Sequence, residues 1–227
     1  MENFLVTTEG AWGDGSVHLT TAGIILVAAL ILILLVAAAL IRQHRSEKKA
    51  LLTTRQLVFS AAAIALSLVC SMIKLFEMPM GGSVTLLSML FVVLIANWYG
   101  PYVGLMTAVA YGLVQFVMEP IFYTLPQMLL DYPLAFGALG LAGFFRKKKY
   151  GLQIGYIVGV LGRFLCSTLS GVLFFAAFAP EGMHPLVYSM GYQASYLVPE
   201  AIITLLLITI KPVSKALNHI KTLALGD

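Results

Sequence analysis

Long apolar stretches separated by short polar segments make up most of the chain. The first apolar stretch, residues 21–41, contains no charged residue and is followed by a basic segment that starts at Arg42. Further apolar stretches follow at residues 56–73, 84–97, 102–117, 123–145, 152–178 and 186–210. Because a helix needs about 20 apolar residues to cross a bilayer core of roughly 30 Å, this pattern predicts about seven transmembrane helices.

Composition favours a membrane protein over a soluble one. Of the 227 residues, 60% are hydrophobic and only 11% are charged, and the mean hydropathy is +0.94. A soluble domain would have too little charge to cover its surface. We therefore expect an all-α integral membrane protein. Residues 1–50 would hold an extracellular segment, an extra transmembrane helix and a basic cytoplasmic loop, and residues 51–227 a six-helix membrane domain.

A cleaved secretory signal is the alternative interpretation of residues 21–41. The segment before this stretch carries Glu2, Glu9 and Asp14 where a signal peptide has basic residues. The apolar run is also longer than the core of a typical signal peptide, so a retained transmembrane helix is the preferred interpretation.

Positive charge gathers in three connections, at residues 42–55, at residues 146–149 and around Lys211, Lys215 and Lys221. With seven spans, all three lie on one side of the membrane, which the positive-inside rule makes the cytoplasm. This arrangement predicts a multi-pass cell-membrane protein with its N-terminus outside and its C-terminus in the cytoplasm. The net charge of +4 then reflects topology and contact with anionic lipid headgroups, so no nucleic-acid partner is expected.

Motifs for common catalytic chemistry do not occur in the sequence. Cys70 and Cys166 lie in apolar stretches, with no Cys or His spacing that predicts a zinc site. Walker A, Gly-x-Ser-x-Gly and His-Glu-x-x-His sequences are likewise missing. We expect no catalytic residue, no metal site and no cofactor, and energy for any uphill transport would have to come from another protein.

Three charged residues lie inside predicted spans: Asp131, Arg163 and Glu200. A charge near the bilayer centre costs at least about 2.5 to 3.5 kcal/mol unless it is paired or hydrated, so such residues usually have a function. Asp131 and Arg163 are predicted at similar depths on different helices. They would form either a structural ion pair or two sides of a site for a polar ligand.

Aromatic residues are concentrated in the same outer half of the predicted bundle. They are Tyr123, Tyr132, Phe174, Phe175, Phe178, Tyr188, Tyr192 and Tyr196. Interfacial belts and ordinary packing account for many such residues in membrane proteins. Their coincidence with Asp131 favours a pocket for a flat cationic or heteroaromatic ligand, held by stacking, cation-π attraction and one carboxylate.

Several short motifs are distributed along residues 52–215. They are Gly-Gly-Ser-Val-Thr-Leu at 81–86, Leu-Asp-Tyr-Pro-Leu-Ala-Phe at 130–136, Gly-Arg-Phe at 162–164, Ser-Gly at 170–171, Ala-Pro-Glu-Gly at 179–182 and Tyr-Ser at 188–189. In order and separation these motifs resemble the thiamine-specific S component of energy-coupling factor (ECF) transporters. The stretch at residues 21–41 lies outside the resemblance.

The resemblance implies a six-helix S-component bundle plus one extra N-terminal transmembrane helix. Members of this family capture a vitamin from outside and dock on an ECF transmembrane coupling protein driven by two ATPase subunits. Ala61 and Ala65, four residues apart on one predicted helix, match the alanine face that meets the coupling protein. Small residues at this spacing allow close helix packing, although alanine is also simply common in membrane helices.

The resemblance also assigns a substrate site. Asp131 matches the acidic position that hydrogen-bonds the aminopyrimidine ring of thiamine, and Tyr132 lies beside it. Arg163 matches a basic position of the fifth family helix. Tyr188 and Gln193 match the aromatic and amide positions that close the pocket from the last helix.

The chain departs from the family pattern at several of these positions. Ser167 stands where the family has His, Gln193 where it has Asn, and Asp131 where Glu is usual. A family Trp is replaced near Gly82, and Phe175 stands where another Trp can occur. A site built on buried hydrogen bonds loses about 1 to 3 kcal/mol for each unpaired group, so such changes can redirect specificity.

Three alternatives to thiamine capture therefore remain. The same fold could bind a pyrimidine or thiazole precursor or a related heteroaromatic, or the chain could be a membrane scaffold that binds no small molecule. An intramembrane enzyme is disfavoured because no nucleophile has an evident base. For a transport subunit, the loops at residues 78–83 and 180–185 are predicted to close over the ligand.

Overall fold

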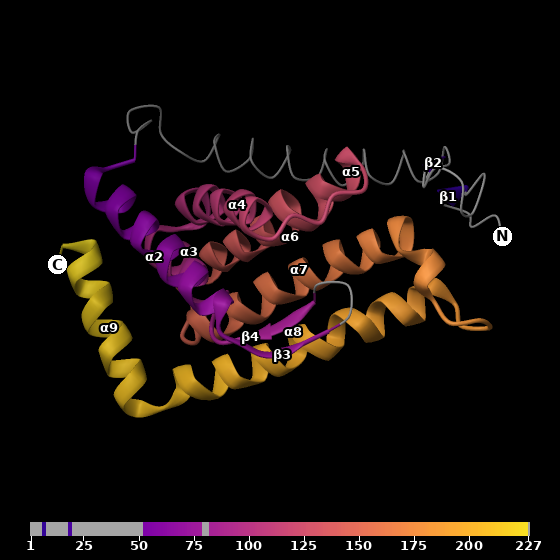
Figure 1. Ribbon diagram of the computed structural model, residues 1–227. Coiled ribbons are helices and arrows are strands. Elements are labelled where there is room, and N and C mark those ends of the chain that lie inside the picture. The colour runs from indigo at the N-terminus through magenta and orange to yellow at the C-terminus, as the bar shows by residue number, and fades with distance from the viewer. Residues whose placement is uncertain (1–5, 8–17, 20–51, 79–81, 227) are drawn as a thin grey trace.

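The computed structural model describes residues 6–7, 18–19, 52–78 and 82–226. Its main part is a bundle of apolar helices with a short β-hairpin packed beside the last long helix of the bundle (Figure 1). Near the N-terminus, β1 (Val6–Thr7) pairs antiparallel with β2 (His18–Leu19). The predicted span at residues 21–41 and the basic cluster that follows it at 42–49 lie outside the described residues.

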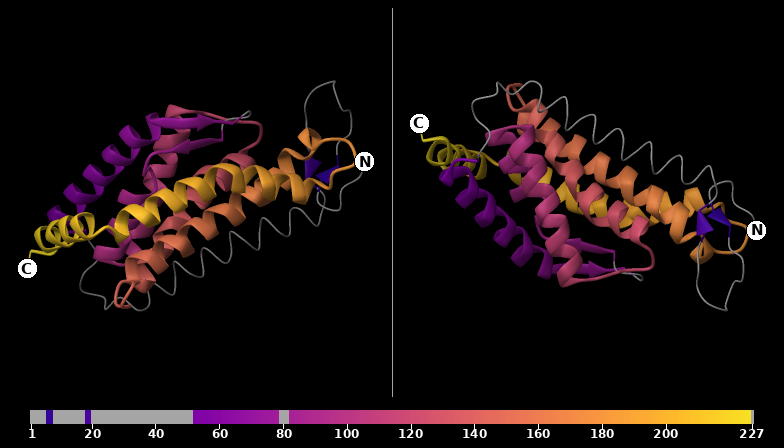
Figure 2. Two further views of the ribbon diagram at one scale, coloured as in Figure 1. Left: turned by 90° about the horizontal axis from the view of Figure 1, so that it is seen from below. Right: turned by 90° about the horizontal axis from the view of Figure 1, so that it is seen from above.

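Among the described residues, five helices are long and apolar enough to cross a membrane, and a shorter apolar helix packs with them. They are α2 (Thr54–Met72), α3 (Leu90–Tyr99), α4 (Pro101–Met118), the continuous segment Leu125–Phe145, α7 (Gly151–Phe174) and α8 (Pro185–Thr209), of which α3 is the short one. The predicted helical membrane fold is confirmed. In Figure 2, α7 and α8 run side by side along the length of the bundle.

The segment Leu125–Phe145 changes its helical form along its length. It consists of α5 (Leu125–Leu129), the π-helical turn η2 (Leu130–Leu134), α6 (Ala135–Gly137) and the 3-10 segment η3 (Ala138–Phe145). After α7, the 3-10 turn η4 (Ala176–Phe178) leads toward α8, so the predicted span at 152–178 is divided in two.

The predicted span at residues 84–97 is wrong in its first half. Ser83–Thr85 is strand β4, which pairs antiparallel with β3 (Lys74–Glu77). Helix α3 begins only at Leu90, and its ten residues span about 15 Å, half the thickness of a bilayer core. Helix α3 is therefore apolar because it packs inside the protein and not because it crosses the bilayer. Eight of its ten residues are buried inside the bundle.

A further helix follows the last span. Helix α9 (Lys211–Leu225) begins with Pro212 at its second position, where proline does not disturb a helix, and turns away from α8 (Figure 1). The Tyr99 hydroxyl donates to the Ala224 carbonyl at 2.8 Å, which holds the end of α9 against α3. The lysines at 211, 215 and 221 therefore lie on a helix at one end of the bundle.

Glycines allow the central helices to pack backbone against backbone. A Cβ atom at Gly140 would lie 2.6 Å from the Cα atom of Leu105, and one at Gly143 would lie 2.3 Å from the Pro101 nitrogen. Both distances are shorter than any real contact. Close approach of α4 and η3 through small residues is typical of helices that pack in a membrane, where dispersion contacts replace the hydrophobic effect.

Helix α2 lies at the edge of the bundle. Thr53 caps it, because its hydroxyl accepts from the Gln56 N–H while the Gln56 side chain accepts from the Thr53 N–H. Ala61 and Ala65 are exposed on this helix, together with larger apolar residues such as Leu57, Leu66 and Val69.

Candidate functional site

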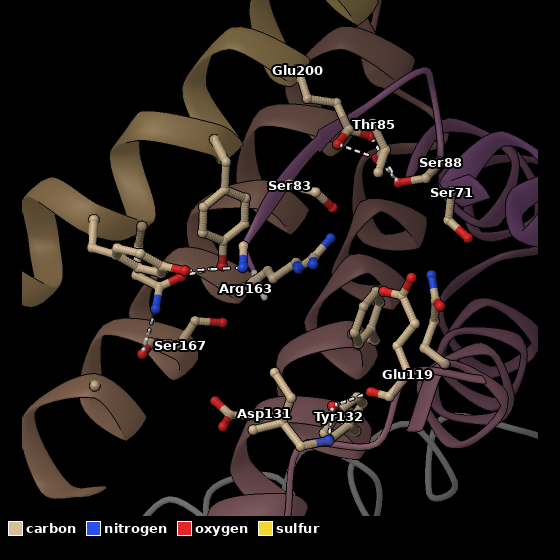
Figure 3. Close-up of a pocket in the computed structure, with 18 of the residues that line it drawn as sticks. Ser71, Ser83, Thr85, Ser88, Glu119, Asp131, Tyr132, Arg163, Ser167 and Glu200 are labelled. Carbon is tan, nitrogen blue, oxygen red and sulfur yellow. Dashed lines mark hydrogen bonds between the residues drawn. The ribbon is translucent and has the colours of Figure 1, made fainter. Parts of the chain in front are cut away.

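A cavity of about 390 Å³ opens among the hairpin, the end of α4, the η2 turn, α7 and α8 (Figure 3). All seven residues predicted to contact a substrate line it: Asp131, Tyr132, Arg163, Ser167, Phe175, Tyr188 and Gln193. Their contact with a substrate is not tested by this geometry and stays a prediction. Ala61 and Ala65 lie elsewhere, on the exposed face of α2.

The η2 turn places Asp131 and Tyr132 on the cavity wall. Pro133 has no backbone N–H to donate to the preceding turn, and the Ala135 N–H reaches back five residues to the Leu130 carbonyl. This wider π-helical turn is a local irregularity of the kind that often occurs at functional sites. In Figure 3 the Asp131 carboxylate points into the cavity.

Gln127 orients the Asp131 carboxylate. Its side-chain nitrogen donates to Asp131 Oδ2 at 2.6 Å and to the Ile121 carbonyl at 3.2 Å, and its Oε1 accepts from the Tyr123 N–H at 3.0 Å. Gln127 is fully buried. The carboxylate is thus held by a side chain that is itself fixed to the α4–α5 connection.

Tyr132 joins the same connection through its hydroxyl. The hydroxyl donates to the Glu119 carbonyl at 2.7 Å and accepts from the Ile121 N–H at 2.9 Å. Its hydrogen-bonding capacity is largely satisfied within the protein. The Tyr132 ring, packed edge-on against Phe116, therefore offers the cavity mainly an apolar surface.

One face of α7 supplies Arg163, Ser167 and Gly171, and Phe175 follows directly after the end of this helix. The four residues are spaced at intervals of four and all line the cavity. The Arg163 guanidinium carbon lies 4.1 Å from the centre of the Phe136 ring, a cation-π arrangement. Its Nε has no hydrogen-bond partner in the described part of the chain. Among the described residues Arg163 forms no salt bridge, so the structural pair with Asp131 that was one of two predictions is not present.

Helix α8 contributes a ladder of tyrosines. The rings of Tyr188 and Tyr192 are 6.3 Å apart, and those of Tyr192 and Tyr196 are 5.9 Å apart. Between them, Gln193 donates from Nε2 to the Ser167 carbonyl at 3.2 Å and accepts from the Tyr196 hydroxyl. Gln193 therefore joins α8 to α7 as well as facing the cavity.

Gly82 lies directly against the tyrosine ladder. Its N–H donates to the Tyr192 hydroxyl at 2.9 Å, and a Cβ atom at this position would lie 2.8 Å from that hydroxyl and 2.9 Å from a Tyr196 ring carbon. The backbone thus leaves no room for a side chain on this side. The chain therefore brings its own backbone onto the aromatic wall.

A buried carboxylate forms the end of the cavity. Glu200 is 2% exposed, and its two oxygens accept from the hydroxyls of Thr85 at 2.6 Å and Ser88 at 2.8 Å (Figure 3). The Met89 N–H adds a longer contact of 3.4 Å. These bonds attach the middle of α8 to the segment that connects β4 with α3.

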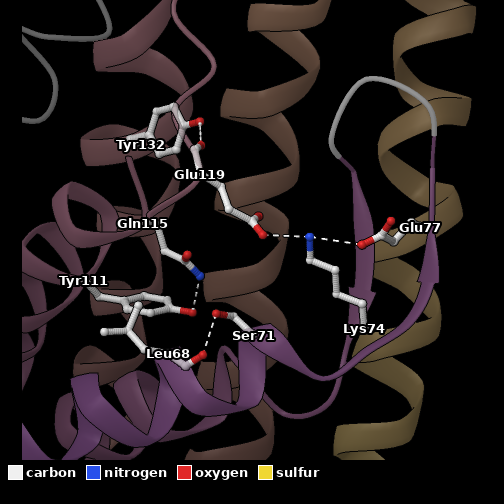
Figure 4. Close-up of polar contacts among 8 residues, drawn as sticks. All are labelled: Leu68, Ser71, Lys74, Glu77, Tyr111, Gln115, Glu119 and Tyr132. Carbon is white, nitrogen blue, oxygen red and sulfur yellow. Dashed lines mark hydrogen bonds and ion pairs between the residues drawn. The ribbon is translucent and has the colours of Figure 1, made fainter. Parts of the chain in front are cut away.

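An ionic cluster connects the hairpin with the end of α4 at the mouth of the cavity (Figure 4). Lys74 Nζ lies 2.6 Å from Glu119 Oε1 and 3.1 Å from Glu77 Oε1. The hydrogen bond that Lys74 donates to Glu119, followed by the one that it donates to Glu77, raises the pKa of Lys74 above its ordinary value. Lys74 and Glu119 both line the cavity, so this cluster joins its two rims.

Sequence reasoning missed Gln127, Lys74 and Glu119 as parts of the site. Gln127 could have been predicted from the sequence, because it precedes Asp131 by four residues on a helix, a spacing that permits a Gln–Asp hydrogen bond. The ion pair of Lys74 and Glu119 joins strand β3 to the end of α4, which are distant in sequence, and no local pattern indicates it.

The wall chemistry suits a small polar molecule with aromatic character. Asp131, Glu200 and Arg163 supply charge, while tyrosine rings and Phe175 supply flat apolar surfaces. Within the described residues no group of three or more His, Cys, Asp or Glu is placed to hold a metal ion. Fold and cavity together define a multi-pass membrane protein with a polar, aromatic pocket of small-molecule size between its helices.

Comparison with known proteins identifies the family. Residues 57–219 match the model of the thiamine transporter protein family. The thiamine transporter ThiT of Bacillus subtilis is 37% identical over 160 residues, which cover 64% of this chain and 82% of that protein. ThiT of Lacticaseibacillus paracasei is 29% identical over 109 residues, covering 42% and 52%. The chain therefore belongs to the thiamine transporter protein family, and the family predicted from its motifs is confirmed.

A solved structure supports the fold independently. ThiT from Listeria monocytogenes superposes with a TM-score of 0.57 at 22% identity, covering 69% of this chain and 94% of that one. At this identity the structural similarity supports the helical fold alone. Membership of a transporter family implies a transport role and a multi-pass membrane location for this chain.

Proposed function

We propose that this protein is the substrate-binding membrane subunit of an ECF-type importer, and that it captures thiamine from outside the cell. Its family and the thiamine transporters among its relatives support this function. The observation that carries it is the placement of Asp131, whose carboxylate is oriented by Gln127 and faces an aromatic cavity of about 390 Å³.

The cavity chemistry complements both rings of thiamine. Asp131 would accept hydrogen bonds from the amino side of the pyrimidine, while the tyrosine faces of α8 and Phe175 would stack on flat rings. The thiazolium carries a positive charge, which aromatic faces and the two carboxylates Asp131 and Glu200 would stabilise. The role is transport, with no chemical step assigned to this subunit.

Direct titration of the purified protein with thiamine tests the proposal. In calorimetry we expect saturable binding of one thiamine per chain, with weaker binding of the separate pyrimidine and thiazole precursors. Tighter binding of a precursor would keep the family and change the substrate. No heat with any of the three, in protein that unfolds cooperatively, would contradict the proposal and favour a scaffold role.

The cluster of Lys74, Glu77 and Glu119 would retain the bound ligand by holding the hairpin over the cavity. Replacing Lys74 with methionine should raise the rate constant of thiamine release about three- to fivefold, since a partly exposed ion pair contributes up to about 1 kcal/mol. Release of radiolabelled thiamine after dilution measures this rate, with Lys74→Arg as the charge-preserving control. An unchanged rate of thiamine release in Lys74→Met would show that the cluster does not retain the ligand.

The sign of the Lys74 pKa shift sets the pH range of this effect. A lysine whose pKa is raised by its partners stabilises the folded state below its unfolded pKa of about 10.4, and this contribution is lost only as pH rises through the higher folded value. Titration of Lys74 should therefore leave thiamine release unchanged between pH 7 and pH 9.

Coupling to the ATP-driven partners is proposed to occur through α2. Ala61 and Ala65 are exposed on this helix, where small side chains would let a helix of the transmembrane coupling protein approach closely. The variant Ala61→Leu with Ala65→Leu should lower thiamine uptake by cells at least fivefold while leaving thiamine affinity of the purified protein unchanged. Normal uptake at normal expression would contradict this docking face.

We further propose how the chain is oriented in the membrane and into which two parts it divides. The basic residues at 146–149 and on α9 would face the cytoplasm, which places the cavity toward the outside. Residues 1–50 would form an added N-terminal segment with one transmembrane helix, and residues 51–227 the substrate-binding domain.

A further inference from the structure

A second cavity, of about 320 Å³, lies at the other end of α7. The thiamine-family site lies along the C-terminal half of this helix, whereas the second cavity surrounds its first turn at Gly151, Leu152 and Gln153. The remaining walls come from the connection that precedes α7, from α9, from Ile208 on α8 and from Asn97 on α3.

The charges around this cavity have one sign. Arg146, Lys148, Lys149 and Lys221 line it, and none of the acidic residues that the structure describes does. Arg146, Lys148 and Lys149 come from the connection that precedes α7, and the fold brings Lys221 of α9 to the same space. A mixed surface of lysine and glutamate would indicate ordinary solvated side chains, whereas four cations around one concave space favour an anion.

The first turn of α7 presents hydrogen-bond donors to the same space. Helix α7 is 24 residues long and has no side-chain cap at its N-terminus. The Gly151 N–H donates to the Lys148 carbonyl, but the N–H groups of Leu152 and Gln153 have no acceptor among the described residues. Free N–H groups and the positive end of the helix dipole together favour binding of an oxyanion.

Asn97 provides an independent indication of a ligand. It is 6% exposed and lines the cavity, yet its side-chain nitrogen has no hydrogen-bond partner within the part of the chain that the structure describes. A buried amide without a partner is unfavourable, so such groups usually bind a water, an ion or a ligand. Here the donor faces a cavity already lined by cations.

We propose that this cavity binds a phosphate-type oxyanion, held by the Asn97 amide, the free N–H groups of α7 and the lysines at 148, 149 and 221. The phosphate would belong either to the headgroup of an anionic lipid or to a soluble phosphate compound. The site is separate from the thiamine pocket, and its occupation would fix α9 against α3 and α7.

Matched variants of the full chain in neutral detergent test the site. The probes are phosphatidylglycerol against phosphatidylcholine with the same acyl chains, and inorganic phosphate against chloride at equal ionic strength. Binding is read by native mass spectrometry for lipid and by the shift of the thermal unfolding midpoint for both, since a ligand of the folded state stabilises it. Lys148→Gln removes a lining charge, and Lys147→Gln removes the neighbouring charge that does not line the cavity.

We expect selective stabilisation of the wild type by phosphatidylglycerol, by phosphate or by both, and these outcomes identify the source of the anion. Lys148→Gln and Asn97→Leu should each weaken binding roughly tenfold, the loss expected for a charge-assisted contact, while Lys147→Gln changes it less than twofold. Thiamine affinity should be unchanged in all three variants. Equal losses in Lys147→Gln and Lys148→Gln, or no preference of the wild type for either anion, would overturn the proposal.

Discussion

Replacing Asp131 with asparagine is expected to weaken thiamine binding about a hundredfold, or ~2.7 kcal/mol. The wild-type carboxylate has two acceptor oxygens, one of which is bound by Gln127. In the asparagine variant, the amide oxygen would keep the bond from Gln127, and the amide nitrogen would face the amino group of the ligand. Two donors would then oppose each other in a partly buried site, and the negative charge opposite the cationic ligand would be lost.

Calorimetric titration of the purified variants measures this effect. Glu47→Gln is the matched control, because it removes one negative charge in the polar segment at residues 42–55, which is predicted to lie on the cytoplasmic side, away from the ligand. Asp131→Glu should retain binding with a loss of about tenfold, since it keeps the charge but moves it relative to Gln127. If Asp131→Asn binds thiamine as tightly as the wild type, Asp131 does not contact the ligand.

The positions of Asp131 and Arg163 could be predicted from the sequence for a physical reason. Ionisable residues are so unfavourable in a bilayer that their presence in an apolar stretch points to a cavity or a partner. The structure brings both side chains to one cavity. Their relation to each other could not be predicted, because a direct pair and two separate walls of a site leave the same pattern of charges in the sequence.

Residues of the hairpin and α3 show where apolar patterns mislead. The stretch at 84–97 is apolar enough to predict a span, yet its first residues are a strand and the helix covers only Leu90–Tyr99. A segment buried among other helices has the same composition as one that faces lipid. Only the three-dimensional contacts of Thr85 and Ser88 with Glu200, over 100 residues away in the chain, explain why the helix starts late.

The i, i+4 series on α7 was available in the sequence but was only partly used. Ser167 was assigned to the site through family resemblance, whereas its regular spacing from Arg163 and Gly171 places all three on one helix face by geometry alone. Helix α9 was likewise visible only as a group of lysines. Its amphipathic character became evident once its packing against Tyr99 was known.

Replacing Glu200 with alanine is expected to lower the stability of the protein by roughly 2 to 5 kcal/mol, because it leaves the hydroxyls of Thr85 and Ser88 buried without their acceptor. Thr85 and Ser88 are themselves only 7% and 3% exposed, so water cannot readily replace the carboxylate. The β4–α3 connection would lose its attachment to α8. We therefore expect thiamine affinity to fall together with the thermal unfolding midpoint.

A double-mutant cycle separates this network from a simple loss of packing. Thr85→Val with Ser88→Ala removes the two donors, and combining these changes with Glu200→Ala should cost clearly less than the sum of the separate effects, with a coupling above about 1 kcal/mol. Glu200→Gln preserves the shape and one acceptor, so it should lose less than half as much stability as Glu200→Ala. Additive effects in the cycle would mean that Glu200 stabilises α8 by packing alone, and the hydroxyl pair would then have no part in positioning the wall of the cavity.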